Sequence, residues 1–468
     1  MSAITTPSPR EIIEDFALKI QEKKLKTAKP KFAVINFRTD IQDGKEREIV
    51  KVPIHLLRYR KDNGRISSDV LDYEINIGPL DEKDDKSQKQ IRKFLEQKDP
   101  EKTHTLRMSI IHGGQLEPAI ITCDGFLING NRRKMVMEKL HKEQPHEEKY
   151  AYMKVVILPG KDDEGGPPTL IEIEKIENRY QLQSSGKSEY YGFDRALSIK
   201  RKLELGFSLE EQLKDDPVYA EATKAQLNAA VKRLKKDYLN PLICVDKYLE
   251  QFKREGQYKT ISSRMGDPEG RWQAFIDYSN VYTNYFNNPN KRIELEIEEE
   301  EIGVLEEAAF NIIRLRSIPS MPKVHTIMRE LPKYLETKEG KKAIIKISNN
   351  VDPLLPKEEC YDKNGNPLSY DEIEEKWVAK NKQSITYNVK KASREYDNKR
   401  EKETPLQLLK VAYQKLTHNN MDMRAILIAD QDKARKLAVK IKNRAEDIEK
   451  ELYRFQKDQK KLSKKHAN

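Results

Sequence analysis

The residues best suited to chemistry lie at one junction, the tetrapeptide Gly130-Asn131-Arg132-Arg133. A glycine lets the backbone approach a ligand closely, and the unpaired amide groups of a first helical turn point towards an anion bound there. Arg132 and Arg133 add planar, permanently charged guanidinium groups that match phosphate oxygens. The junction therefore predicts an anion site, and the phosphates of a nucleotide fit it best. The alternative is that both arginines are solvated residues at the start of a surface helix, and so short a motif does not decide between the two.

The elements that must position this junction form a predicted β-hairpin followed by a helix. Residues 119–122 are a β-branched run of strand length, and Asp124-Gly125 is the strongest short signal for a hairpin turn. Residues 126–128 would return as the second strand and lead into Asn129-Gly130. The helix after the junction has its apolar positions at Met135, Val136 and Leu140.

A second pair of residues suited to chemistry is Glu177-Asn178. Thr169–Tyr180 predicts a helix with a threonine cap, and this pair would fall near the end of that helix. A neighbouring carboxylate and amide suit Mg²⁺, a hard cation that proteins bind through few oxygens while substrate phosphates supply others. The alternative is an ordinary helix end, with Asn178 as the terminating residue.

The order of these segments resembles the N-terminal domain of the ParB/sulfiredoxin superfamily. The GNRR sequence at 130–133 stands where ParB-type partition proteins carry a Gly-Glu-Arg-Arg box. Ile176–Gln181 is similar to the Glu-Asn-x-Gln-Arg box of the same family, and the loop Gly114–Pro118, after a helix predicted from Pro100, matches a third box. The resemblance covers residues 45 to 200 and fades after residue 255.

Two departures from the family pattern bear on chemistry. The glutamate of the family's first box is Asn131 here, so a carboxylate role at that position has no residue to perform it. In the sulfiredoxin branch a reactive cysteine stands beside the box glycine, whereas Asn131 follows Gly130 in this chain. The sequence therefore argues against reduction of a sulfinic acid. The second box reads Glu-Asn-Arg-Tyr-Gln, with its glutamine and arginine shifted or exchanged.

The resemblance implies a nucleotide-gated clamp or adaptor on double-stranded DNA, in a partition, mobile-element or defence setting. It implies a nucleoside triphosphate (CTP or ATP) with Mg²⁺, the metal being held by Glu177 and Asn178. The residues that would line the nucleotide pocket are Gly114, Gln115, Gly130, Asn131, Arg132 and Arg133, with Arg58 and Arg60 added from a basic loop. Slow hydrolysis of the CTPase type stays open, because no residue stands out as a general base and Asn131 cannot act as one.

Two other classes of function remain open. One is an enzyme on the same fold, such as an ATPase, a phosphotransferase or a nuclease. The other is a helical scaffold in which the pocket has decayed, an alternative that the unusual length of residues 256–468 supports. The sequence has no histidine-rich metal cluster and no Walker-type phosphate loop that would favour a different fold.

Residues 184–255 predict a helical unit with the outline of a helix-turn-helix. Ser208 and Glu211 form a capping box before a short helix, and Thr223–Lys236 is a basic amphipathic helix with Leu227 and Leu234 inside. Its outward-facing candidates for DNA contact are Lys224, Lys232, Arg233, Lys235 and Lys236. The segment between the helices exceeds the usual turn of about 3–4 residues. The alternative is that these basic residues solvate a packing helix.

Composition sets the outer limits. The chain has 468 residues, of which 35% are charged, and its 88 Lys and Arg exceed its 77 Asp and Glu by a formal +11, which is compatible with a polyanionic partner. Three distant cysteines favour neither a disulfide framework nor a zinc site. No apolar run has the ~20 residues that span a bilayer, and the N-terminus lacks an apolar signal core. We therefore expect a cytoplasmic protein without a membrane partner.

The expected fold class is α+β, with a small mixed α/β domain followed by mostly helical domains and a long C-terminal helix. Aromatic residues at helical spacing, such as Trp272, Phe275 and Tyr278, favour a packed core over base stacking. The expected segments are a tail and helix at 1–30, the ParB/sulfiredoxin-like domain at 31–183, the helix-turn-helix-like domain at 184–255, an aromatic-rich helical domain at 256–335, a linker-like region at 336–405 and a helical or coiled-coil segment at 406–468.

The last segment carries a repeating apolar seam. Alternating 3–4 spacing links Ala438, Ile441, Ala445, Ile448, Leu452, Phe455, Gln459 and Leu462. Such spacing is typical of a coiled coil, so we expect a homodimer formed through the C-terminal helix. The alternative is that this helix docks on its own chain.

Overall fold

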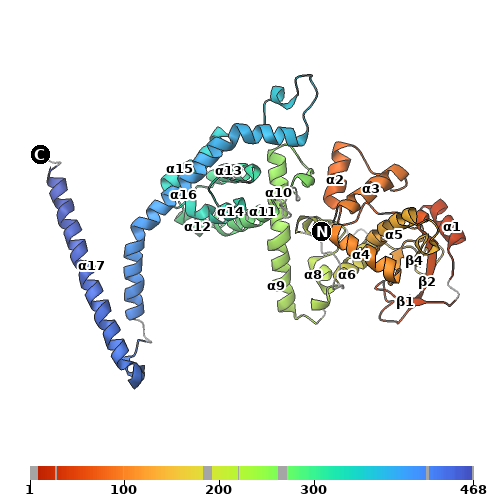
Figure 1. Cartoon of the computed structure of the whole chain (residues 1–468), viewed down its shortest axis with the longest axis horizontal. Coiled ribbons are helices and arrows are strands. Elements are labelled where there is room, and N and C mark those ends of the chain that lie inside the picture. The colour runs from red at the N-terminus through yellow and green to blue at the C-terminus, as the bar shows by residue number, and fades with distance from the viewer. Residues whose placement is uncertain are drawn as a thin grey trace. The chain divides into compact units, whose positions relative to one another are not determined.

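The alternating residues of the N-terminal part form a small mixed sheet, and most of the remaining chain is helical (Figure 1). The computed structural model describes residues 9–26, 29–98, 100–182, 192–219, 221–261, 271–417 and 421–465, with the backbone alone at 181, 182, 217 and 460–465. The chain consists of two compact units, Met1–Tyr396 and Asp397–Asn468. The predicted α+β fold class is confirmed.

The sheet within the described residues is four-stranded, in the order β1-β2-β4-β3. Its strands are β1 (Phe32–Val34), β2 (Glu46–Pro53), β3 (Ala119–Ile121) and β4 (Tyr152–Ile157). Strand β2 pairs antiparallel with β1 and β4, whereas β3 pairs parallel with β4. The helices around the sheet are α1 (Glu14–Lys23), η1 (Ile54–Leu56), α2 (Ser67–Asn76), α3 (Asp85–Gln97), α4 (Pro100–Gly113), α5 (Asn131–Glu143), η2 (Glu148–Tyr150) and α6 (Leu170–Leu182).

Both faces of the sheet are covered, as the alternation of its side chains requires. Ala119 and Ile121 of β3 join a core with α3 and α5 on one face. Ile120, between them, joins a second core with Ile173 and Ile176 of α6 on the other face. The start of α5 and the inner face of α6 are thereby held at the same end of β3.

The predicted hairpin forms a tight turn but not a second strand. The amide of Gly125 donates to the carbonyl of Thr122, and the amide of Thr122 donates to that of Phe126. Residues 126–128 then make only isolated bridges, Phe126 with Arg58 and Leu127 with Ile121. The expectation of a second strand is therefore wrong, because this segment runs through the core between the sheet and the loop at Arg58.

The helix-turn-helix-like segment is helical where it is described. Its elements are α7 (Gly192–Glu204), α8 (Leu209–Lys214), the 3₁₀ turn η3 (Pro217–Tyr219), α9 (Lys224–Leu234), the π-turn η4 (Lys235–Leu239) and α10 (Asn240–Gln251). The domain boundary expected at residues 183–184 lies outside the described residues. Helix α9, predicted to end at Lys236, instead continues through η4 into α10.

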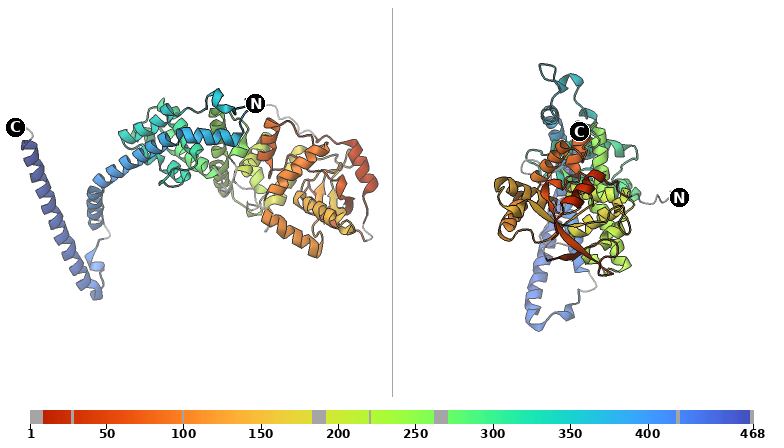
Figure 2. Two further views of the ribbon diagram at one scale, coloured as in Figure 1. Left: turned by 45° about the horizontal axis from the view of Figure 1, so that its top comes forward. Right: turned by 90° about the vertical axis from the view of Figure 1, so that its right-hand side faces the viewer.

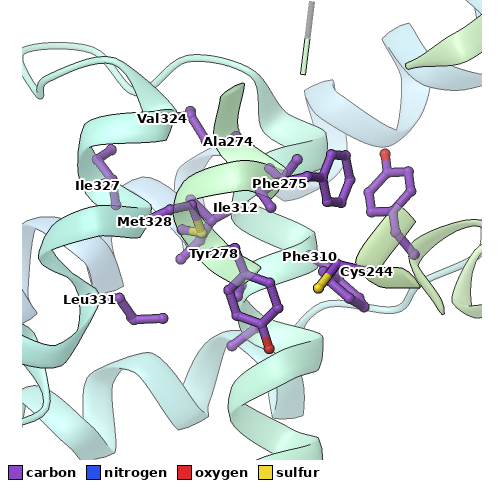
Figure 3. Packing of buried hydrophobic residues seen from close by; sticks show 14 of the residues in the cluster. Cys244, Ala274, Phe275, Tyr278, Phe310, Ile312, Val324, Ile327, Met328 and Leu331 are labelled. Carbon is purple, nitrogen blue, oxygen red and sulfur yellow. The ribbon is translucent and has the colours of Figure 1, made fainter. Parts of the chain in front are cut away.

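A helical bundle follows, and its helices lie side by side in green to cyan in the left view of Figure 2. Its elements are η5 (Tyr258–Thr260), α11 (Trp272–Val281), η6 (Tyr282–Phe286), α12 (Pro289–Glu294), α13 (Glu301–Leu315), α14 (Val324–Tyr334) and α15 (Lys338–Asn350). Figure 3 shows Phe275 and Tyr278 of α11, Phe310 of α13 and Leu331 of α14 directed into one interior. The prediction of a packed aromatic face is confirmed.

The prediction of a linker-like region at 336–405 is wrong. That region forms α15, the short turn η7 (Lys357–Cys360) and the first part of α16 (Tyr370–Leu416). Ile344 and Ile347 of α15 and Trp377 and Ile385 of α16 are buried in the bundle core. Widely spaced apolar residues among many lysines and asparagines obscured this packing, because only one stripe of each helix is buried.

The second unit begins within α16 and contains η8 (Met423–Ala425), η9 (Ile428–Asp430) and α17 (Gln431–Lys465). The expected long C-terminal helix is thus present. Within the described residues, no helix is both long enough and apolar enough to cross a membrane.

Candidate anion-binding site

A cavity of about 380 Å³ lies at the start of α5. Helix α4 contributes one wall, the segment Ile128–Arg133 a second, and Glu177 and Tyr180 of α6 a third. The loop after β2 adds Asn63 and Arg65. Four of the predicted pocket residues, Gly130 to Arg133, therefore line one cavity together with one predicted metal ligand, Glu177.

Gly130 adopts a backbone conformation that is strained for any residue with a side chain. Its φ of +87° lies in the left-handed region, and a Cβ added there would come within 2.8 Å of the Cβ of Ala119. The side-chain oxygen of Asn129 accepts a hydrogen bond of 2.7 Å from the amide of Ile120 and so ties the turn to β3. The first turn of α5 is consequently fixed against the sheet with its N-terminus at the cavity.

Arg133 brings a largely desolvated charge to the cavity. Its side chain is 13% exposed, donates to the carbonyl of Glu117 and lies 3.6 Å from the carboxylate of that residue. Burial lowers the pKa of Arg133, and Glu117, the opposing carboxylate, offsets this only in part. Since the Glu117 side chain is itself 70% exposed, its charge is largely screened by water. An anion in the cavity would complete the compensation.

Asn131 presents an unused acceptor. Its Oδ1 is buried and accepts no hydrogen bond from the described residues. A buried carbonyl oxygen without a donor is costly, because it has lost its water without replacing it. The position therefore favours a ligand that donates a hydrogen bond, such as a ribose hydroxyl, an exocyclic amine or a bound water.

Several cavity residues carry no motif in the sequence. Lys102, Thr105 and Ser109 of α4 follow i, i+3, i+7 spacing and share the face that lines the cavity. Arg65, in the loop between η1 and α2, lines the same cavity. Their helical spacing was available from the sequence, but the contact of this face with α5 depends on how α4 packs.

Arg58 and Arg60, predicted to serve the pocket, do not line it. Arg58 pairs with Asp85 at 2.8 Å and lies over the ring of Phe16. Arg60 is buried between Glu174 and Glu177, at 3.2 and 3.5 Å. Burial alone would lower the pKa of Arg60, but the two carboxylates outweigh it and raise it. Both predictions are wrong, because each arginine is turned to a carboxylate that the fold brings from elsewhere.

The loop Gly114–Pro118 has a structural role at its predicted site residues. The side chain of Gln115 donates to the carbonyl of Lys154 at 2.7 Å and accepts from the amide of the same residue at 2.7 Å. Gln115 therefore anchors the loop to β4, and neither it nor Gly114 lines the cavity. Glu117, two residues further on, is the part of this loop that reaches the site.

The predicted magnesium pair is separated by the fold. Glu177 accepts from the amide of Gly64 and pairs with Arg60, whereas Asn178 points to the next domain. The Oδ1 of Asn178 accepts from the ammonium of Lys202 at 2.8 Å, and its Nδ2 donates to the carbonyl of Gln212. The ammonium group of Lys202 places a positive charge next to this oxygen, which disfavours a metal ion there. The pair lies inside α6 rather than at its end, so the metal prediction is wrong for Asn178.

The part of the chain that the structure describes offers no alternative metal cluster in place of that pair. Over the residues that the structure describes, no group of three or more His, Cys, Asp or Glu side chains could hold a metal ion. Asn178 and Lys202 instead connect α6 to α7. This buried contact joins the sheet domain to the helices that carry the predicted DNA contacts.

The predicted DNA contacts share the outer surface of α9 and η4. Leu227, Ala230 and Leu234 face inward against Leu209 and Leu213 of α8. The five basic candidates, Lys224, Lys232, Arg233, Lys235 and Lys236, are all exposed. Capping boxes begin both helices, Ser208 with Glu211 at α8 and Thr223 with Gln226 at α9. The exposure of these five side chains alone assigns no ligand to this surface.

Comparisons with protein-family models, with curated proteins and with solved structures return no match for this chain.

Proposed function

We propose that the chain binds a nucleoside triphosphate, CTP or ATP, in the cavity at the start of α5 and double-stranded DNA on the surface of α9. In this proposal it acts as a ParB-like nucleotide-gated clamp or adaptor. The observation that carries it is the convergence of Gly130, Asn131 and Arg133 on one cavity of about 380 Å³. That volume lies in the range of about 300–1,000 Å³ typical of ligand sites.

The triphosphate fits the charges of the cavity. Lys102, Arg65, Arg132 and Arg133 line it from three elements, against the carboxylates of Glu117 and Glu177. A phosphate near Arg133 would restore the charge compensation that burial removes. The helix N-terminus at Asn131 adds amide groups that can donate to phosphate oxygens. Its partial positive charge adds to the charge of the arginines.

Magnesium does not fit as a protein-held ion. Glu177 is paired with Arg60 and Asn178 with Lys202, so neither is available as the expected ligand. We therefore derive no step through a metal, and the proposal concerns binding by the residues of the chain.

Nucleotide binding is tested by equilibrium titration of the full-length chain with CTP, ATP and GTP, with and without duplex DNA. Arg132→Ala should raise the dissociation constant of the preferred nucleotide by roughly 10- to 100-fold, as loss of a charged hydrogen bond does. The matched control is Arg58→Ala, which removes the same group from the neighbouring loop outside the cavity. This control should leave the affinity unchanged.

Each other outcome contradicts the proposal in a distinct way. Turnover of ATP without any effect of DNA would favour an enzyme on this fold. Absence of binding by all three nucleotides would favour a helical scaffold. Equal losses in both arginine variants would place the nucleotide elsewhere or attribute the effect to net charge.

A further inference from the structure

Helix α17 carries an apolar seam that the described residues leave uncovered. None of its described side chains, 431–459, is buried, and Leu452 and Phe455 are 49% and 66% exposed. The described seam consists of Ala434, Ala438, Ile441, Ala445, Ile448, Leu452, Phe455 and the polar Gln459. Its alternating 4–3 spacing is the period of a left-handed two-stranded coiled coil. The side chain of Leu462, also in the expected seam, lies outside the described residues.

We propose that this seam binds the seam of a second copy in antiparallel orientation, with the two-fold axis between Glu446 and Asp447. Such an assembly goes beyond the proposed nucleotide and DNA binding and does not depend on it. Side-chain volume and charge select one occupant and one register.

Side-chain volumes along the seam favour the antiparallel orientation. In a parallel pair each residue meets its own counterpart, so Ala438 would face alanine and Phe455 would face phenylalanine. Such layers leave a void at one level and overfill another, and both cost stability. In the antiparallel register Ala438 lies opposite Phe455 of the second copy, Ile441 opposite Leu452, and Ala445 opposite Ile448. The two layers that contain alanine then pair a small side chain with a large one, and the layer of Ile441 and Leu452 pairs two side chains of similar size.

Charges flanking the seam favour the same register. Arg444 would lie opposite Glu451 of the second copy, and Lys442 opposite Glu449. Two-fold symmetry repeats each pair, so four attractive contacts flank the core. In a parallel pair Lys442 would instead meet Leu437, and of these contacts only the one between Arg444 and Glu449 would be attractive. Within the single helix Arg444 reaches Glu451 at 3.7 Å, which shows that both lie along one edge of the seam.

The end of α16 is the competing occupant within the same unit. Leu406, Leu409, Tyr413 and Leu416 form a similar exposed stripe. This stripe is about 15 Å long at ~1.5 Å per residue, whereas the seam from Ala434 to Phe455 is about 32 Å long. A fold-back onto α16 would therefore leave about half of the seam exposed, while a second α17 covers it completely.

Disulfide crosslinking in the full-length chain tests the register. Cys360 is replaced by serine, since Cys123 and Cys244 are buried. Ile441→Cys and Leu452→Cys are then prepared as separate proteins and oxidised alone and mixed. We expect an interchain disulfide only in the mixture. A homodisulfide in I441C alone would show a parallel pair, and monomers without crosslinks would show docking on the same chain; either result overturns the proposal.

A charge exchange provides a second test that keeps the apolar seam intact. Lys442→Glu should raise the dimer dissociation constant, measured by sedimentation equilibrium, by roughly tenfold, because two attractive pairs become repulsive. The double variant K442E/E449K should restore dimerisation. In a parallel pair the lysine introduced at position 449 would instead lie opposite Arg444 of the second copy. The single variant would then have little effect, because position 442 faces Leu437 in a parallel pair, and the double variant would dimerise more weakly than the single one. That pattern would refute the register.

Discussion

Gly130 shows how one residue sets the geometry of the cavity. Its left-handed conformation begins α5, and its missing side chain leaves the space in which Ala119 packs, 2.8 Å from where a Cβ would stand. The two constraints act together, because the same turn must change direction and touch the sheet. A residue with a side chain would move the first turn of α5 away from β3 and shift Arg132 and Arg133 with it.

Gly130→Ala should therefore destabilise the sheet domain more than a glycine substitution that adds strain alone. The left-handed backbone costs roughly 1–2 kcal/mol with a side chain, and overpacking against Ala119 adds about 1–3 kcal/mol. The matched control is Gly114→Ala, where φ is +69° but no atom lies within 4 Å of the added Cβ. Hydrogen–deuterium exchange of β3 and α5 amides measures the difference. Equal effects of the two variants would contradict the packing argument.

One carboxylate of helix α16, that of Glu374, forms ion pairs with three arginines of the bundle. Glu374 accepts from Arg314 at 2.7 Å, from Arg254 at 2.8 Å and from Arg271 at 3.1 Å. These arginines come from α13, from the segment after α10 and from the residue before α11. Arg314 also lies between the rings of Phe252 and Trp377. The region expected to be a linker is thus held by a buried ionic contact as well as by apolar packing.

Glu374→Gln should lower the free energy of unfolding of the bundle by roughly 3–5 kcal/mol, because three buried arginines lose their counter-charge. The two tryptophans of the chain, Trp272 and Trp377, both lie in this core, so their fluorescence during urea unfolding reports this part of the molecule. The neighbouring exposed Glu375→Gln is the control and should have no effect. A decrease as large in the control would refute the role of the Glu374 carboxylate.

The stabilisation that the Glu374 carboxylate contributes should decrease as the pH falls. Burial would raise the pKa of Glu374, but Arg271, Arg314 and Arg254 lower it from 4.5 to about 2. Because the folded-state pKa is depressed, the stabilisation is complete above pH 4.5 and is lost as the pH falls towards 2. The difference between E374Q and the unaltered chain should shrink over that interval. A constant difference would show that the carboxylate charge is not what stabilises α16.

At the scale of the whole molecule, the proposed binding of DNA depends more on where the basic residues lie than on the net charge of the chain. The formal charge of +11 is small for 468 residues, because 77 Asp and Glu offset most of the 88 Lys and Arg. The outer surface of α9 departs from this pattern with its five exposed basic residues, although Arg233 pairs with Asp237 at 3.4 Å. DNA bound there would release counterions in proportion to the phosphates contacted.

If DNA binds to α9 as proposed, the triple variant K232A/R233A/K236A should bind duplex DNA more weakly. It should also reduce the slope of log affinity against log salt concentration, by about 0.9 for each phosphate that the variant no longer neutralises. The charge-matched control is K86A/K89A/K93A, which removes three exposed lysines from α3. Fluorescence anisotropy at several salt concentrations measures both slopes. Equal reductions in the two variants would mean that only net charge matters, and no reduction in either would exclude α9 from the DNA contact.

The sequence by itself determined the local elements: the turn at Asp124-Gly125, the start of α5 at Gly130, the capping box at Ser208 and the seam of α17. These signals act over a few residues, through turn conformation, capping hydrogen bonds and helical period, so they are present before the chain folds. The α+β class follows from the same local patterns.

Only the tertiary structure decided which side chains face the cavity. Arg58 and Arg60 are neighbours in sequence, yet one pairs with Asp85 and the other with Glu174, 114 residues away. Lys102 and Ser109 carry no motif and enter the cavity because α4 packs beside α5. A charged side chain turns to whichever partner the fold brings within a few ångströms, and that choice depends on contacts between distant elements, which local spacing does not encode.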